Sequence, residues 1–136
     1  MLASQIKIIY EDDDILIIDK PSGLLTHPKN KSDQSENVVS WLLKNRPSVK
    51  DVGEDKTRPG IVHRLDKETS GLLLIAKNQK SFDYLKGLFQ KREIVKTYIA
   101  LVYGRLKNPE KSLRDLGTGK KGVIEIPLGK LGTRQT

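Results

Sequence analysis

The sequence contains no cysteine and only two histidines. Without cysteine, the chain can form no disulfide, thiolate nucleophile, iron–sulfur cluster or cysteine-ligated zinc site. The two histidines, His27 and His63, are far apart in the sequence and lack the spacing typical of paired metal ligands. We therefore expect no metal site, and the composition is compatible with a reducing compartment.

Long hydrophobic runs are also missing. No segment approaches the roughly 18 apolar residues of a transmembrane helix, and the first residues lack the basic and apolar regions of a signal peptide. The length of 136 residues fits a single domain. We therefore expect a cytoplasmic protein of one domain that makes no contact with membranes.

Positive charge is abundant and concentrated in one part of the chain. The net charge is +8, and residues 77–121 alone carry 12 basic and 4 acidic residues, whereas residues 1–76 are nearly balanced. A concentrated basic segment is typical of nucleic-acid binding. A lysine-rich, solvated surface that keeps a small protein soluble is the alternative.

The hydrophobic pattern predicts an α+β fold. Short β-branched or alternating runs indicate strands, and apolar residues at helical spacing indicate helices, the first of them capped by Asn37. The expected strands cover residues 6–10, 15–19, 72–76, 95–103 and 123–126, and the expected helices cover residues 38–45 and about 82–89. We therefore expect a mixed, mainly antiparallel sheet with flanking helices.

Three further segments have distinct expectations. The run LLLIA at residues 72–76 is apolar throughout, which is consistent with a strand buried on both faces. Residues 48–60 are expected to form an exposed loop, and residues 108–122 a basic one. Residues 117–122 match G-x-G-x-x-G, but they precede an expected strand, so we expect no dinucleotide cofactor.

A dense polar cluster, HRLDKETSG at residues 63–71, precedes the apolar strand. Its Asp66 has Arg64 and Lys67 as neighbours, and nearby cations favour an ionised carboxylate that can act as a nucleophile or a base. The alternative is a turn in which the side chains of Asp66, Thr69 and Ser70 bond local backbone amides. The residues alone leave both interpretations open.

Three motifs together resemble the RluA-type pseudouridine synthases. The cluster at residues 63–71 and the following LLLIAK resemble the signature of this family. Residues 10–28, with Lys-Pro-Ser-Gly at 20–23 and a nearby His27, are similar to its opening strand, turn and strand. Residues 96–104 (KTYIALVYG) are similar to its Lys-x-Tyr-x-Ala-x-Val-x-Gly segment.

The resemblance implies isomerisation of uridine to pseudouridine in ribosomal or transfer RNA, with no cofactor or metal. Asp66 matches the catalytic aspartate, and Tyr98 matches a tyrosine that lies against the uracil and assists proton transfer, so Asp66 and Tyr98 are the candidate catalytic residues. Arg64 matches an arginine that displaces the target nucleotide from the RNA stack, which is needed because a stacked base cannot be rotated and reattached. The candidate RNA-contacting residues in the same motifs are His63, Thr69 and Lys96.

The resemblance does not extend to the last residues. The family carries a later Gly-Arg-x-His-Gln-Ile-Arg-like motif with a basic partner for the catalytic aspartate, and nothing after Gly129 matches it. We therefore expect residues 1–136 to be the N-terminal portion of one catalytic domain, without a separate N-terminal RNA-binding domain. A non-catalytic RNA-binding remnant and an incomplete fragment of the enzyme are the alternatives.

Overall fold

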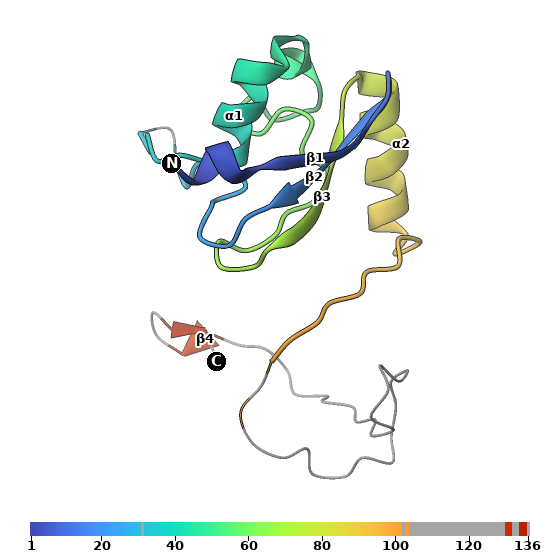
Figure 1. Ribbon diagram of the computed structural model, residues 1–136. Helices are drawn as coiled ribbons and strands as arrows, with labels where there is room; N and C mark the ends of the chain where they lie inside the picture. Colours follow the sequence, from blue (N-terminus) through green and yellow to red (C-terminus); the bar gives the residue numbers. More distant parts are fainter. Residues whose placement is uncertain (31, 102, 104–129, 132–133, 136) are drawn as a thin grey trace. The chain divides into compact units, whose positions relative to one another are not determined.

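A computed structural model describes residues 1–30, 32–101, 103, 130–131 and 134–135 (Figure 1). The chain separates into two compact units, Met1–Lys96 and Thr97–Thr136. In the second unit, β4 (Lys130–Leu131) pairs antiparallel with β5 (Arg134–Gln135). All other helices and strands described below belong to the first unit.

The first unit is built on a three-stranded antiparallel sheet. A 3-10 turn η1 (Leu2–Gln5) precedes β1 (Lys7–Glu11), which pairs with β2 (Ile15–Lys20), and β2 pairs with β3 (Gly71–Ala76). The register from β2 to β3 runs without a break and ends with Lys20 opposite Gly71. The chain that leaves β2 therefore lies beside the chain that enters β3, and the candidate catalytic cluster is in that second segment.

Only one face of this sheet is buried by the described residues. The inward side chains of β2 and β3 have no exposed surface: Leu16, Ile18, Leu73 and Ile75. Leu72, on the opposite face of β3, is 62% exposed. The prediction of a strand buried on both faces is therefore wrong, because within the described part of the chain the helices pack against the inward face alone.

Two helices cover that inward face. Helix α1 (Val38–Asn45) begins at Asn37, whose side chain accepts a hydrogen bond from the Ser40 N–H, while the Ser40 hydroxyl accepts one from the Asn37 N–H. Helix α2 (Gln79–Gln90) is longer than predicted because it begins at the cap Asn78. The predicted helix at residues 38–45 is confirmed.

Residues 47–61 are partly packed into the core, so the prediction of an exposed loop at residues 48–60 is right only in part: Lys50, Lys56 and Arg58 are exposed. The segment begins with the 3-10 helix η2 (Pro47–Asp51) and buries Val49, Val52 and Pro59. Gly60 then approaches β3 so closely that a Cβ atom there would lie 2.6 Å from the carbonyl oxygen of Ala76. The chain thus covers the edge of β3 before it enters the candidate catalytic cluster.

The predicted strand at residues 95–103 is absent from the described residues 95–101, which have no regular secondary structure. A strand needs a neighbour for its backbone hydrogen bonds, and the ladders among the described residues include none with this segment. The predicted strand at residues 123–126 and the basic loop at 108–122 lie outside the described residues. Within the described part of the chain, no helix is long and apolar enough to cross a membrane.

Candidate active site

The cluster at residues 63–70 forms a loop that ends in β3. Its turn is closed by the backbone, with the Thr69 N–H donating to the Asp66 carbonyl oxygen at 3.1 Å. Gly71 follows with a φ of +124°, which side-chain-bearing residues rarely adopt. The hydrogen bonds of the described residues include none to the Asp66 carboxylate, so the alternative in which that side chain caps the turn is wrong. The exposed carboxylate remains accessible to a substrate.

Four hydrogen bonds from the segment after β2 hold the backbone of this loop. They end on the backbone carbonyl oxygens of three residues of the loop, one before Asp66 and two after it. The donors and acceptors are Thr26 Oγ1 to Leu65 (2.8 Å), Gly23 N and Lys20 Nζ to Lys67 (2.8 and 3.1 Å) and Ser22 Oγ to Glu68 (2.7 Å). The residues on either side of Asp66 are therefore fixed by contacts across roughly 40 positions of sequence, which is long-range preorganisation of a reactive group.

Lys20 is the central donor of this arrangement and has no exposed surface. Its ammonium donates to the carbonyl oxygens of Pro21 (3.0 Å), Leu24 (2.8 Å) and Lys67 (3.1 Å). Burial lowers the pKa of Lys20, while the negative charges of Glu68 and Asp66 act in the opposite direction. A buried positive charge thus lies close beneath the loop that carries Asp66.

His63 is packed onto the sheet and α2. Its Nε2 accepts the backbone N–H of Leu74 at 2.9 Å, and its ring stacks on Phe89 with centroids 4.7 Å apart. Burial, followed by the positive charge of Lys96, lowers the pKa of His63 to about 4. The neutral ring therefore holds the start of the loop against β3 through the Leu74 N–H.

Lys96 approaches the same aromatic ring, with its ammonium 6.0 Å from the Phe89 centroid. This distance is at the limit of a cation–π contact. Two of the predicted site residues, His63 and Lys96, therefore meet around Phe89, a residue for which the sequence predicted only a place on a helix face.

The charged side chains of the loop point to solvent. Arg64 and Asp66 are both exposed, and the ion pairs among the described residues include neither of them. Lys67 lies 3.9 Å from the Glu68 carboxylate instead. The expected pairing of Asp66 with neighbouring cations is thus not formed, and the Arg64 guanidinium nitrogen Nη1 lies 3.2 Å from His27 Nε2.

Tyr98 belongs to the second unit, which is described separately from the loop. Its side chain is 59% exposed. The first unit therefore brings together five of the six predicted site residues, four of them on one loop. The sequence assigned no role to Lys20, Ser22, Thr26 or His27. Lys20 is a charged residue at a buried position of β2, a strand whose residues alternate between buried and half-buried.

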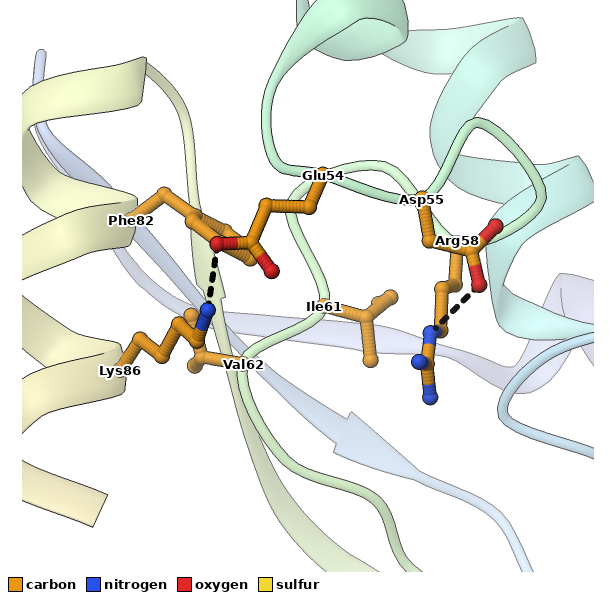
Figure 2. A pocket seen from close by; sticks show the side chains of 7 residues that line it. All are labelled: Glu54, Asp55, Arg58, Ile61, Val62, Phe82 and Lys86. Carbon is orange, nitrogen blue, oxygen red and sulfur yellow. Dashed lines mark hydrogen bonds and ion pairs between the residues drawn. The ribbon is translucent and has the colours of Figure 1, made fainter. Parts of the chain in front are cut away.

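A separate pocket of about 170 Å³ lies between the residues that precede the loop and helix α2 (Figure 2). Its lining comprises Glu54, Asp55, Arg58, Ile61, Val62, Phe82 and Lys86. Both of its basic side chains are paired with its own carboxylates, Arg58 with Asp55 at 2.9 Å and Lys86 with Glu54. None of the predicted site residues lines it. Among the described residues, no group of three or more His, Asp or Glu side chains is arranged to hold a metal ion.

Comparisons with known proteins agree with the motif at Asp66. The family model for RNA pseudouridylate synthase matches residues 14–128. A ribosomal large subunit pseudouridine synthase D from Borreliella burgdorferi is 44% identical over 131 residues, which cover 92% of this chain and 40% of that relative. The enzyme of the same name from Nitrosomonas europaea is 40% identical, with coverage of 94% and 32%.

A solved structure, human RNA pseudouridylate synthase domain containing 4, is 28% identical with a TM-score of 0.45, and the match covers 63% of this chain and 30% of that one. The chain spans 40% and 32% of the length of these two curated relatives. The match of the family model extends over most of the chain and includes the whole of the loop that carries Asp66. The chain therefore belongs to the RNA pseudouridylate synthase family.

Proposed function

We propose that this chain carries the catalytic aspartate of an RNA pseudouridine synthase, which isomerises uridine to pseudouridine in ribosomal or transfer RNA. The observation that carries the proposal is the exposed Asp66 on a loop whose backbone is bonded on both sides of it. A fixed backbone with an accessible carboxylate is the arrangement that a reacting group requires.

The reaction is redox-neutral and needs no group other than protein and RNA. The bond between the ribose C1′ and the uracil N1 breaks, the base rotates, and a bond forms between C1′ and C5. The proton on C5 is lost and N1 gains a proton, so the product is an isomer of the substrate. Asp66 acts in this scheme either as the nucleophile on the sugar or as the base that removes a sugar proton.

The other site residues divide between contact with RNA and positioning. We propose that Arg64 fills the space of the displaced nucleotide, because a guanidinium stacks on bases and binds phosphates. Tyr98 offers an aromatic face to the uracil, and Thr69 and Lys96 contact the RNA. His63 fits positioning better than direct contact, since its Nε2 is bonded to Leu74 and its ring lies on Phe89.

We further propose that both units belong to the N-terminal part of one catalytic domain. The family match supports this, because it runs without interruption across the boundary between residues 96 and 97. The names of the bacterial relatives favour large-subunit ribosomal RNA as the substrate. We also propose a cytoplasmic location, which fits either substrate.

Release of tritium from RNA that contains 5-tritiated uridine tests the proposal, because the C5 proton is lost only when the isomerisation occurs. Asp66→Asn is compared with Asp51→Asn, which changes an equally exposed aspartate in η2. We expect release by the wild type and by Asp51→Asn, and none by Asp66→Asn. Equal release by all three proteins would show that Asp66 is not catalytic.

RNA binding without catalysis is the second candidate function. It is favoured by the concentration of basic residues at 77–121, where 12 basic residues stand against 4 acidic ones. It predicts RNA affinity that falls steeply between about 50 and 200 mM salt, as expected when several phosphates are neutralised, with no tritium released. Affinity that does not change with salt would exclude it.

A further inference from the structure

His27 lies beside Arg64 at the surface of the candidate active site. The Arg64 guanidinium nitrogen Nη1 is 3.2 Å from His27 Nε2, and His27 Nδ1 is 2.9 Å from the carbonyl oxygen of Pro28. We propose that His27 is a positioning residue, which holds the guanidinium of Arg64 on the Asp66 loop ready to bind the RNA where the target nucleotide is displaced. The inference rests on the proposed role of Arg64 in RNA binding.

The two contacts of the imidazole assign its tautomer. A carbonyl oxygen only accepts hydrogen bonds, so Nδ1 must carry the proton that is donated to Pro28. A guanidinium only donates, so Nε2 must present its lone pair to Arg64. Both contacts are satisfied together only by the neutral ring protonated on Nδ1. His27 thus offers a hydrogen-bond acceptor to the Arg64 cation. A directional contact of this kind orients the guanidinium, which packing alone does not do.

The backbone on both sides of this contact is fixed. Thr26, which precedes His27, is 3% exposed and donates to the carbonyl oxygen of Leu65, which follows Arg64. The Thr26 carbonyl oxygen also accepts the N–H of Val39 in α1. The two neighbouring pairs, Thr26 with Leu65 and His27 with Arg64, therefore form successive cross-links between the same two segments.

This geometry leaves most of the guanidinium available. An arginine side chain has five N–H donors, and His27 engages one nitrogen of Arg64. The remaining donors can bind phosphate or a base edge while the side chain stays in one orientation. Holding a long, flexible side chain in its bound conformation reduces the ordering cost on binding. Because Arg64 is exposed, the contact adds little to folding stability.

A double-mutant cycle on RNA affinity tests the proposal. Binding of a single-stranded, uridine-containing RNA oligonucleotide is measured by fluorescence anisotropy for the wild type, His27→Ala, Arg64→Ala and the double variant. We expect His27→Ala to weaken binding about fivefold, the effect of one hydrogen bond of ordinary strength, and to have no further effect when Arg64 is already alanine. A fivefold loss in the Arg64→Ala background, or a wild type that binds no better than Arg64→Ala, would overturn the proposal.

Two conservative variants separate orientation of Arg64 from a general structural role. His27→Gln can place its carbonyl oxygen where Nε2 lies and should restore binding. His27→Asn reaches only the position of Nδ1 and should bind as weakly as His27→Ala. Equal affinity of the Gln and Asn variants would contradict the assignment.

Long-range proton–nitrogen NMR spectra of the imidazoles provide a readout that needs no RNA. We expect His27 to carry its proton on Nδ1 and its Nε2 resonance to shift in Arg64→Ala. A ring protonated on Nε2 cannot accept from Arg64 and would refute the inference. One outcome is a wild type that releases no tritium while the RNA affinities in the cycle still show coupling between His27 and Arg64. That result would contradict the proposed reaction and support the role of His27.

Discussion

Replacement of Lys20 by methionine should loosen the loop that carries Asp66. Methionine retains the apolar stem in the wholly buried site, but it removes the ammonium that donates to three carbonyl oxygens. The Lys67 carbonyl keeps a second donor, the Gly23 N–H at 2.8 Å. The hydrogen bonds of the described residues give the Pro21 and Leu24 carbonyls no other donor.

The size of the effect follows from those two carbonyls. A buried acceptor that loses its partner costs about 1–3 kcal/mol, so the buried Leu24 carbonyl costs about 2 kcal/mol and the part-buried Pro21 carbonyl about 1 kcal/mol. The lost bond to Lys67 adds about 1 kcal/mol, since that oxygen remains bonded. Relief of the desolvation that lowers the pKa of Lys20 offsets part of this sum. We expect Lys20→Met to lower the free energy of unfolding by about 3 kcal/mol.

Urea unfolding followed by Trp41 fluorescence measures this change, because the single tryptophan packs against the core. With a slope of about 1.5 kcal/mol per molar urea, the midpoint should fall by about 2 M. Lys56→Met, at an exposed turn, is the matched control and should stay within about 0.5 kcal/mol of the wild type. Equal midpoints for Lys20→Met and Lys56→Met would refute the view that the Lys20 ammonium holds the loop.

Two further predictions concern His63 and the glycines that flank the loop. Because burial lowers the pKa of His63 from 6.5 to about 4 in the folded chain, the unfolded chain binds the proton first and stability falls as the pH drops from 6.5 to 4. His63→Gln, which keeps an acceptor for the Leu74 N–H, should lose less stability between pH 7 and pH 4.5 than the wild type in urea titrations, and an equal loss would contradict the assignment. Gly60→Ala should lower the thermal midpoint more than Gly71→Ala. A Cβ at Gly60 would lie 2.6 Å from the Ala76 carbonyl oxygen, whereas one at Gly71 meets nothing within 4 Å and adds only backbone strain of about 1–2 kcal/mol. A larger drop for Gly71→Ala would contradict this packing.

Local signals in the sequence predicted the helices and the first three strands well. Asn37 ends an extended segment and begins a helix through its own side chain, so its effect is readable within four residues. The polar triplet at residues 12–14 joins β1 to β2 in the same local way, because the Asp12 carboxylate accepts from the N–H groups of Asp14 and Ile15. Such contacts need no knowledge of the rest of the chain.

The wrong predictions depend on what lies across space. The apolar run at residues 72–76 is suited to burial on both faces, but the described residues provide helices for one face alone. The alternating run at 95–103 is suited to a strand, yet a strand forms only where a neighbour supplies the other half of its ladder. Gly60 lies in a loop as predicted, but its burial could not be predicted because it comes from Ala76 and Val49, which meet it across space. Composition cannot report such partners.

The candidate site divides in the same way. Asp66 and Arg64 could be selected from the sequence because their motif resembles the signature of the family, whereas the residues alone leave a turn open as the alternative. The donors that hold the motif, such as Thr26 and Lys20, come from a segment about 40 residues earlier and act through the backbone of the loop. Backbone acceptors carry no sequence signature, so only the register of β2 with β3 reveals which donors meet them.

Positioning of Asp66 and stabilisation of its charge are therefore separate tasks in this fold. The nearby Lys20 ammonium is already committed to three carbonyl oxygens, and the Arg64 guanidinium lies against His27. The loop is thus preorganised by its backbone, while the ion pairs among the described residues of the first unit include none with the Asp66 carboxylate. A carboxylate in this state can be presented to RNA with its geometry intact. Under the proposed mechanism, a cation that pairs with this carboxylate should change the rate of isomerisation far more than the affinity for RNA.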